Sequence, residues 1–328
     1  MNTSLAGLLL WTSIAHAMAP MIDSKAAACA SLIPAAVGGP MPPDSVATLR
    51  WFGTTNFELA YRDQVILLDT FYNRGPRFRP IGFTVDQVKR ADAILIGHGH
   101  WDHISDVAPV AKQTGARVIG APVTIEAAVK LGVPASQTEV VHGGETLKFK
   151  GFTVETILAQ HSTLSPEVVK SFSNAIAVAA GESTPEQNAL EEAIEARGTS
   201  DPRVIKEGTI AYLFTFDGGF RLIYRNSAGP ITDAERAVMQ RIGSKTDVAI
   251  VAYIGPYIAQ RQIAATLPII QLYNPMLYLP AHHDEIPGLF LDIGIEPLRM
   301  AIRDQMPGTR SYSQLYREPM CLNVKSKR

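Results

Sequence analysis

The sequence predicts an α/β domain over residues 46–328. Short stretches rich in β-branched and aromatic residues alternate with amphipathic helical stretches, and glycine, proline or aspartate marks the turns between them. One stretch, ADAILIG at 91–97, is almost continuously apolar, which is typical of a strand buried on both faces. With 328 residues, the chain can bury a sizeable core as one large domain or two smaller ones.

The first half of this region is predicted to be rich in strands. Three strands follow one another at short spacing, and the apolar stretch is the fourth. Helices and strands then alternate, and a hairpin pattern closes the half. In chain order we expect strands at 46–53, 56–61, 64–70 and 91–97, a helix at 104–115, a strand at 116–121, a helix at 122–132 and a hairpin at 145–160.

A polar, helix-like insertion at 162–208 interrupts the alternation. Its central helix has Thr184 as N-cap, Pro185 in the first position and Gln187 closing a capping box, and Gly198 marks its end. The insertion could be a lid over a pocket or a contact in a homodimer. After it we expect strands over 208–226 around a turn at 217–219, a helix at 231–243, a strand at 248–254, a helix at 259–272 and a last strand at 276–282.

Residues 1–17 are expected to be a signal peptide. An apolar stretch ends in Ala15-His16-Ala17, an A-x-A cleavage pattern, although no Lys or Arg precedes it. Residues 18–45 are predicted to be a linker. The protein is then periplasmic or secreted, or cytoplasmic if the N-terminus is instead a disordered tail. In an oxidising compartment Cys29 and Cys321 could form a disulfide, and two free thiols are the alternative.

Composition narrows the class of partner. The formal net charge of −1, with no basic stripe, argues against nucleic acid and against an anionic membrane surface. No apolar run reaches the roughly 18 residues that a membrane-spanning helix needs. The expected partner is a small-molecule substrate, and a homodimer is a further expectation.

The stretch LIGHGHWDHISD, residues 95–106 in the loop after the apolar strand, concentrates metal-ligand side chains. His98 and His100 lie two residues apart, so an extended backbone sends both imidazoles to one side. Asp102 and His103 are adjacent and would diverge toward a second position. The pattern can therefore hold two cations, with zinc as the expected metal and manganese or iron as alternatives. A lone histidine would more often belong to the core, but this cluster is too dense for that interpretation.

In its motifs, and in their order from about 46 to 290, the chain resembles the metallo-β-lactamase superfamily of hydrolases. HGHWDH matches the signature loop of that family, and Asp69 ends a strand at the position of its buried aspartate. His161 and His282 match two later ligands, each after a strand. The pattern is most similar to the branch that includes ascorbate-phosphate lactonases. This resemblance implies an αββα sandwich of two mixed β-sheets flanked by helices.

The resemblance also implies two sets of metal ligands. Asp69 would orient a ligand imidazole, and His283 would lie beside the site or replace His282 if the match shifts by one residue. The first ion would be held by His98, His100 and His161, and the second by Asp102, His103 and His282.

One residue departs from the family pattern. The segment FRLIYRNSAG places Asn226 where the family usually has an aspartate that bridges both metals. A neutral amide oxygen is a weaker ligand than a carboxylate, so the second ion could bind loosely, a single ion could suffice, or the site could be more electrophilic. Some dehalogenases of the superfamily that act on chlorinated aromatics resemble this arrangement. Alternatively, Asn226 caps a turn and the bridge is absent.

The expected chemistry is hydrolysis by a metal-activated water, with Asp102 and His100 as catalytic residues. Substrates would be a lactone, an ester, an amide or a phosphodiester. The alternatives are hydrolytic dehalogenation of a chlorinated aromatic, iron-dependent oxygenation, and a non-catalytic metal-binding protein. Candidate substrate-binding residues, each of which could equally be structural, are Trp101, Phe71, Tyr72, Arg74, Tyr253 and Tyr257.

Overall fold

A computed structural model describes residues 37–44, 46–76, 78–163, 166–167, 170, 184–253, 259–284 and 294–325, with the side chains of 259–262 left out. In these ranges none of the helices has both the length and the hydropathy of a membrane span. The predicted signal peptide lies outside the described residues.

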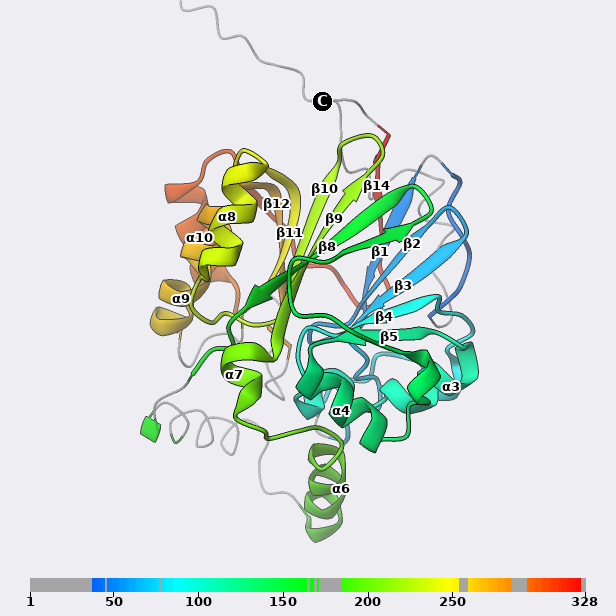
Figure 1. Ribbon diagram of the computed structural model, residues 1–328. Helices are drawn as coiled ribbons and strands as arrows, with labels where there is room; N and C mark the ends of the chain where they lie inside the picture. Colours follow the sequence, from blue (N-terminus) through cyan, green and yellow to red (C-terminus); the bar gives the residue numbers. More distant parts are fainter. Residues whose placement is uncertain are drawn as a thin grey trace, which may run out of the picture.

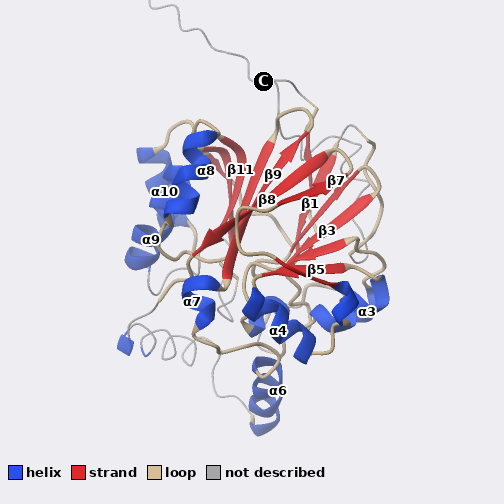
Figure 2. Ribbon diagram, in the orientation of Figure 1, coloured by secondary structure: helices blue, strands red, loops and turns tan. Residues whose placement is uncertain are grey.

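Two seven-stranded mixed β-sheets form the centre of the molecule (Figures 1 and 2). Sheet A has the order β14-β1-β2-β3-β4-β5-β6, and sheet B the order β13-β12-β11-β10-β9-β8-β7. The strands of sheet A are β1 (Ala47–Trp51), β2 (Phe57–Tyr61), β3 (Gln64–Leu68), β4 (Ala93–Leu95), β5 (Arg117–Gly120), β6 (Thr138–Val140) and β14 (Pro319–Leu322). The strands of sheet B are β7 (Thr146–Phe149), β8 (Phe152–Ala159), β9 (Thr209–Phe216), β10 (Arg221–Arg225), β11 (Thr246–Ala252), β12 (Pro275–Ala281) and β13 (Arg310–Ser311).

Helices cover the outer faces of both sheets. In Figure 2, α8, α9 and α10 gather on the side of β11, whereas α3 and α4 lie below β5. The helices are α2 (Trp101–Ile104), α3 (Val107–Thr114), α4 (Pro122–Lys130), α6 (Pro185–Glu195), α7 (Arg203–Glu207), α8 (Asp233–Arg241), α9 (Ala259–Tyr273) and α10 (Glu296–Gln305), with short 3-10 turns η1 (Val85–Gln87) and η2 (Ala135–Gln137). These layers confirm the predicted αββα sandwich.

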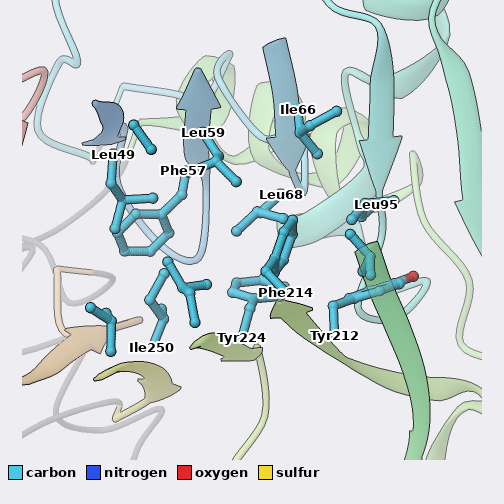
Figure 3. Close-up of a cluster of buried hydrophobic side chains, with 14 of the residues drawn as sticks. Leu49, Phe57, Leu59, Ile66, Leu68, Leu95, Tyr212, Phe214, Tyr224 and Ile250 are labelled. Atoms are coloured by element: carbon cyan, nitrogen blue, oxygen red, sulfur yellow. The ribbon is translucent and has the colours of Figure 1, made fainter. Parts of the chain in front are cut away.

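Alternate side chains of each strand enter different cores, because successive residues of a strand point to opposite faces. Leu59, Leu68 and Leu95 of sheet A meet Phe214 and Ile250 of sheet B in the core between the sheets (Figure 3). The neighbouring strand residues face outward, so a second cluster lies between sheet A and helices α3 and α4, and a third between sheet B and helices α8 to α10.

Most predicted elements are confirmed, with three differences. The helix expected at 104–115 is two helices, because Asp106 leaves the helical conformation and accepts backbone N–H groups from Tyr72 and Asn73. The strand at 276–282 is not the last element: α10 and β14 follow, and β14 pairs antiparallel with β1. The described end of the expected linker packs on the domain, since Val37 is buried and Gly38 donates to Glu58.

Cys321 lies in β14 and forms a disulfide. The chain has only one other cysteine, Cys29, which lies outside the described residues. The pairing of Cys29 with Cys321 therefore stays a prediction.

Candidate metal centre

The loop after β4 delivers four of the predicted ligands. His98 follows the strand, and His100 is the N-cap of α2 with an extended backbone (φ −69°, ψ 158°). Asp102 and His103 then lie in the single turn of α2 and are buried. The change from extended chain to helix brings His103 next to His98, with ring centroids 3.9 Å apart.

A first group of imidazoles comes together from this loop and from the end of β8. His98, His100 and His161 each offer a ring nitrogen, and these atoms lie within 4.8 Å of one another. The Nε2 of His98 is 3.1 Å from the Nδ1 of His100. His98 is buried, whereas the other two imidazoles are partly exposed, so the group is reached from their side.

A second group adjoins the first. His98, Asp102 and His103 each offer a ligand atom as well, and these atoms lie within 4.8 Å of one another. The Oδ2 of Asp102 is 3.1 Å from the Nε2 of His103 and 3.1 Å from the Nε2 of His282. His282 follows β12 in a left-handed backbone conformation (φ +69°), and its backbone N–H donates to the carbonyl of Thr54. The six predicted ligands therefore converge from three strand ends.

Three of these imidazoles are held by the ring nitrogen that faces away from the group. The Nδ1 of His161 contacts the carbonyl of Ser162 at 2.6 Å, and a carbonyl can only accept. The Nδ1 of His103 contacts Asp69 Oδ2 at 2.7 Å, and that of His98 contacts Asn226 Oδ1 at 2.9 Å. With Nδ1 as the donor, each ring in its neutral form keeps its Nε2 lone pair for a ligand, which is the usual arrangement of metal-bound histidines.

The electrostatics of the two groups differ. Burial lowers the pKa of His98 well below its ordinary value, with neighbouring imidazoles adding to the effect, and lowers the pKa of His161 to about 4. These rings are therefore neutral at pH 7, as metal binding requires. Burial also disfavours a charged His103, but Asp102 and Asp69 outweigh it and raise its pKa to about 9. In turn, His103 and His282 overcome burial and hold the pKa of Asp102 well below its usual range.

The donor set fits a transition-metal ion. Two ligand atoms about 2.1 Å from a tetrahedral zinc ion lie about 3.4 Å apart, close to the 3.1 Å spacings in both groups. The Nε2 of His103 is buried and makes no hydrogen bond with the described residues, although the carboxylate of Asp102 is near it. Nitrogen and carboxylate ligands of this kind suit zinc, manganese and iron, so the structure contains a His/Asp metal-binding site of undetermined metal.

Asp69 lies behind this site, directly after β3. Its Oδ1 accepts from the backbone N–H of Gly97, and its Oδ2 contacts His103 Nδ1. The hydroxyls of Thr55 and Tyr224 also donate to Oδ2, as does the amide of Asn226. Neither Thr55 nor Tyr224 was a predicted site residue: each is a strand or turn residue with an ordinary local pattern, and only the fold brings it to Asp69.

The structure places Asn226 beside the ligand rings, on the side of their Nδ1 atoms. Its Oδ1 contacts His98, and its Nδ2 donates to Asp69 at 2.8 Å and lies 3.2 Å from the Nδ1 of His103. The other predicted neighbour, His283, is buried and stacks on Trp51 with ring centroids 4.6 Å apart.

The candidate substrate residues are dispersed. Trp101 is partly exposed next to His100 and packs edge-on against the buried ring of Phe71. Arg74 is buried and donates to Asp284 and Tyr316. Tyr72 and Tyr253 are also buried, in the outer cores of sheet A and sheet B respectively, and Tyr257 lies outside the described residues. Phe78, an aromatic residue of the same loop as Phe71 and Arg74, is partly exposed and contacts Trp101.

Comparison with known proteins connects this site to a family. A family model described as a β-lactamase superfamily domain matches residues 64–184. A protein of Azorhizobium caulinodans named as a metal-dependent hydrolase is 31% identical over 42% of this chain and 60% of its own length. A protein of Rhizobium meliloti with the same description is 32% identical over 35% of this chain and 48% of its own. The chain thus matches about half the length of these relatives.

Solved structures share the fold. Igni18, a metallo hydrolase from Ignicoccus hospitalis, is 17% identical with a TM-score of 0.56 and matches 84% of this chain and 98% of its own. CmlA, a diiron β-hydroxylase from Streptomyces venezuelae, is 15% identical with a TM-score of 0.52 and matches 86% of this chain and 55% of its own. The sandwich, the convergent side chains and the family model over residues 64–184 support a place in the metallo-β-lactamase superfamily, and the solved structures show that the fold is shared.

Proposed function

We propose that the protein is a metal-dependent hydrolase of a small organic substrate, such as a lactone, an ester, an amide or a phosphodiester. One observation carries the proposal: imidazole nitrogens and a carboxylate from separate segments of the chain meet in two adjoining groups. The naming of the relatives as metal-dependent hydrolases supports it.

Each of the two groups would bind one metal ion. His98, His100 and His161 would hold one ion, and Asp102, His103 and His282 a second. A divalent zinc, manganese or iron ion would acidify water and polarise an acceptor oxygen of the substrate.

The chain's own groups would position the reactants. Asp102 keeps its carboxylate ionised, because His103 and His282 hold its pKa low, so it can accept a hydrogen bond from water and orient it. His100 and His161 form the partly exposed side of the site, so the substrate would approach over them. Trp101, which follows His100 in the chain, forms a partly exposed aromatic pair with Phe78, and this pair would offer an apolar surface to the substrate.

The test begins with the metal. Elemental mass spectrometry of the purified protein after dialysis should find one or two transition-metal ions per chain. Removal with a chelator should abolish hydrolysis across a panel of lactones, esters, amides and phosphodiesters, and zinc, manganese or iron should restore it. A chlorinated aromatic belongs in the same panel, since dehalogenation is the rival reaction.

Two variants and a control make the test specific. His100→Ala and Asp102→Ala should lose metal and turnover together. His142→Ala removes an exposed imidazole whose residue contributes only a backbone N–H to Glu145, so it should leave both unchanged. A protein that holds no metal would overturn the proposal, and one that holds metal but turns over no member of the panel would favour a non-catalytic role.

We also propose that the protein is exported and processed after Ala17. The apolar segment with its A-x-A pattern and the disulfide at Cys321 both support an oxidising compartment. N-terminal sequencing of protein recovered from the periplasm or medium of an expressing bacterium should begin at Met18. Recovery from the cytoplasm alone, with Met1 retained and both thiols free, would contradict the proposal.

A further inference from the structure

We propose that Asn226 is a positioning residue that sets the tautomer of His98, and that it acts from outside the metal ligands rather than as one of them. The inference rests on the metal-dependent function proposed above. It concerns the one position where this chain departs from the family pattern.

The orientation of the Asn226 amide follows from Asp69. The carboxylate of Asp69 can only accept hydrogen bonds, so the Asn226 atom that lies 2.8 Å from it must be the NH₂ group. The carbonyl oxygen therefore points to His98, 2.9 Å from Nδ1. Because that oxygen can only accept, the proton of the neutral imidazole must be on Nδ1 and the lone pair on Nε2.

The hydrogen bonds from Asp69 through Asn226 to His98 act on the nitrogen of His98 that faces the metal group. The Nε2 of His98 is the nitrogen that lies 3.1 Å from His100 Nδ1, inside the first group. The carboxylate of Asp69 thus fixes the Asn226 amide, which in turn fixes the tautomer of His98 in the first group. Asp69 also contacts His103 of the second group directly. The two groups are connected through hydrogen bonds of the protein behind them.

The packing around Asn226 keeps its side chain in place. The residue is 1% exposed, and a Cβ atom built on Gly97 would lie 2.1 Å from the Cγ of Asn226. Only glycine at position 97 leaves room for the amide, and the backbone N–H of the same glycine donates to Asp69. The sequence therefore accommodates Asn226 at a defined place behind the metal-binding loop.

An aspartate at position 226 would not fit this arrangement. Its second oxygen would replace the NH₂ group and face Asp69 Oδ2 across a buried distance of 2.8 Å. Two carboxylates at that distance repel each other unless one of them takes up a proton. A positioning role thus requires the amide, whereas a ligand role would favour the carboxylate, which binds divalent metals more strongly.

The decisive experiment is a metal-affinity measurement on Asn226→Asp. Competition of the full-length protein with a chromogenic chelator for zinc should show an affinity at least 10-fold weaker than wild type, the size expected when a residue behind a ligand is lost. Asn188→Asp places the same change at an exposed position of α6 and should leave the affinity unchanged. Tighter or unchanged zinc binding by Asn226→Asp would overturn the inference.

A second measurement needs no variant and guards against a substitution that prevents folding. Long-range ¹H–¹⁵N NMR of the metal-free wild-type protein should show His98 with its proton on Nδ1, and Asn226→Ala should lose that preference. A proton on Nε2 in the wild-type protein would overturn the inference. Failure of the wild-type protein to bind zinc would instead refute the proposed function, so the two failures are distinguishable.

Discussion

The Nδ1 of His103 lies 2.7 Å from the Oδ2 of Asp69, an oxygen to which two hydroxyls and an amide also donate. One carboxylate oxygen thus binds buried donors from the turn before β2, from α2, from β10 and from the residue after β10. Asp69 is therefore a point where the sandwich and the metal site depend on each other.

Replacing Asp69 with Asn should weaken both metal binding and the fold. An NH₂ group in place of Oδ2 would face donors, and each buried donor left without an acceptor costs about 1–3 kcal/mol. We expect a loss of several kcal/mol in the free energy of unfolding, measured by urea titration of the metal-free protein, and zinc affinity at least 10-fold weaker. Asp217→Asn, at an exposed carboxylate bound to Arg62, is the control and should change neither quantity measurably.

The buried ion pair of Arg74 and Asp284 should be a major support for the loop after β3. The two side chains are almost fully buried, and burial would raise the pKa of Asp284 were it not outweighed by Arg74, which lowers it. The Nε and Nη2 of Arg74 have no hydrogen-bond partner among the described residues, so losing Asp284 would leave a buried cation still less compensated. Asp284→Asn should cost about 3–5 kcal/mol of unfolding free energy.

The exposed pair of Arg90 and Asp63 provides the comparison for that measurement. Asp63→Asn should change the free energy of unfolding far less than Asp284→Asn, because solvent screens exposed charges. Equal costs for the two substitutions would show that the Arg74–Asp284 pair has no special role.

Arg225 should stabilise the segments that carry His161 and Asn226. Its Nη2 donates to the backbone carbonyls of Gln160 and of two residues after β10, and its Nε lies 3.3 Å from Glu235. Arg225→Met should therefore destabilise the fold by about 3–5 kcal/mol and weaken zinc binding, since it frees the chain next to His161.

A double-mutant cycle separates the loss of the Arg225–Glu235 ion pair from the loss of the hydrogen bonds that Arg225 donates to backbone carbonyls. Glu235→Gln in the Arg225→Met background should recover part of the unfolding free energy, because it removes the carboxylate left without its cation. It should not recover zinc affinity, because the backbone carbonyls still lack their donor. Recovery of both together would count against a positioning role for Arg225.

Ionised Glu145 should stabilise the fold, so the free energy of unfolding should decrease when this carboxylate is protonated in acid. Burial alone would raise its pKa, but hydrogen bonds from Thr156 and from the backbone N–H groups of His142 and Gly143 outweigh it and lower it. A lowered folded-state pKa stabilises the fold above the ordinary value of 4.5, and this contribution is lost as the pH falls through the folded-state value.

The matching measurement is urea unfolding of wild type and Glu145→Gln between pH 7 and pH 3. The wild-type protein should be more stable by about 1 kcal/mol at pH 7, and the difference should vanish toward pH 3. A difference that grows in acid would have the wrong sign for this explanation.

Local sequence signals predicted most of the elements and the side chains that come together at the candidate metal centre, because those signals lie within a few residues. The spacing of His98, His100, Asp102 and His103 and the capping box at Thr184 are signals of this kind. The contacts of Asp69 with Thr55 and Tyr224 are different, since Tyr224 is 155 positions away and is brought near only by the packing of the two sheets. The contacts of Asn226 with Asp69 and His98 depend on the same packing.

The pairing of β1 with β14 also escaped prediction, because PMCL is a short segment whose partner lies more than 270 residues earlier. Propensity over four residues carries little information, and the partner is chosen by the completed sheet. The break between α2 and α3 has a similar origin: Asp106 serves as a backbone acceptor for Tyr72 and Asn73, a demand that comes from another loop.

The pairing of β1 with β14 sets the time at which the chain can finish folding. Figure 1 shows the blue first strand beside the red last one, and Ala47 pairs with Leu322. During synthesis this edge of β1 has no partner until residue 322 has left the ribosome, because the strand that covers it is made about 270 residues later. Contacts between such distant residues slow folding. The nascent chain can therefore complete sheet A only after residues 319–322 have been made, and until then it presents an open strand edge to chaperones, translocation machinery or other unfinished copies.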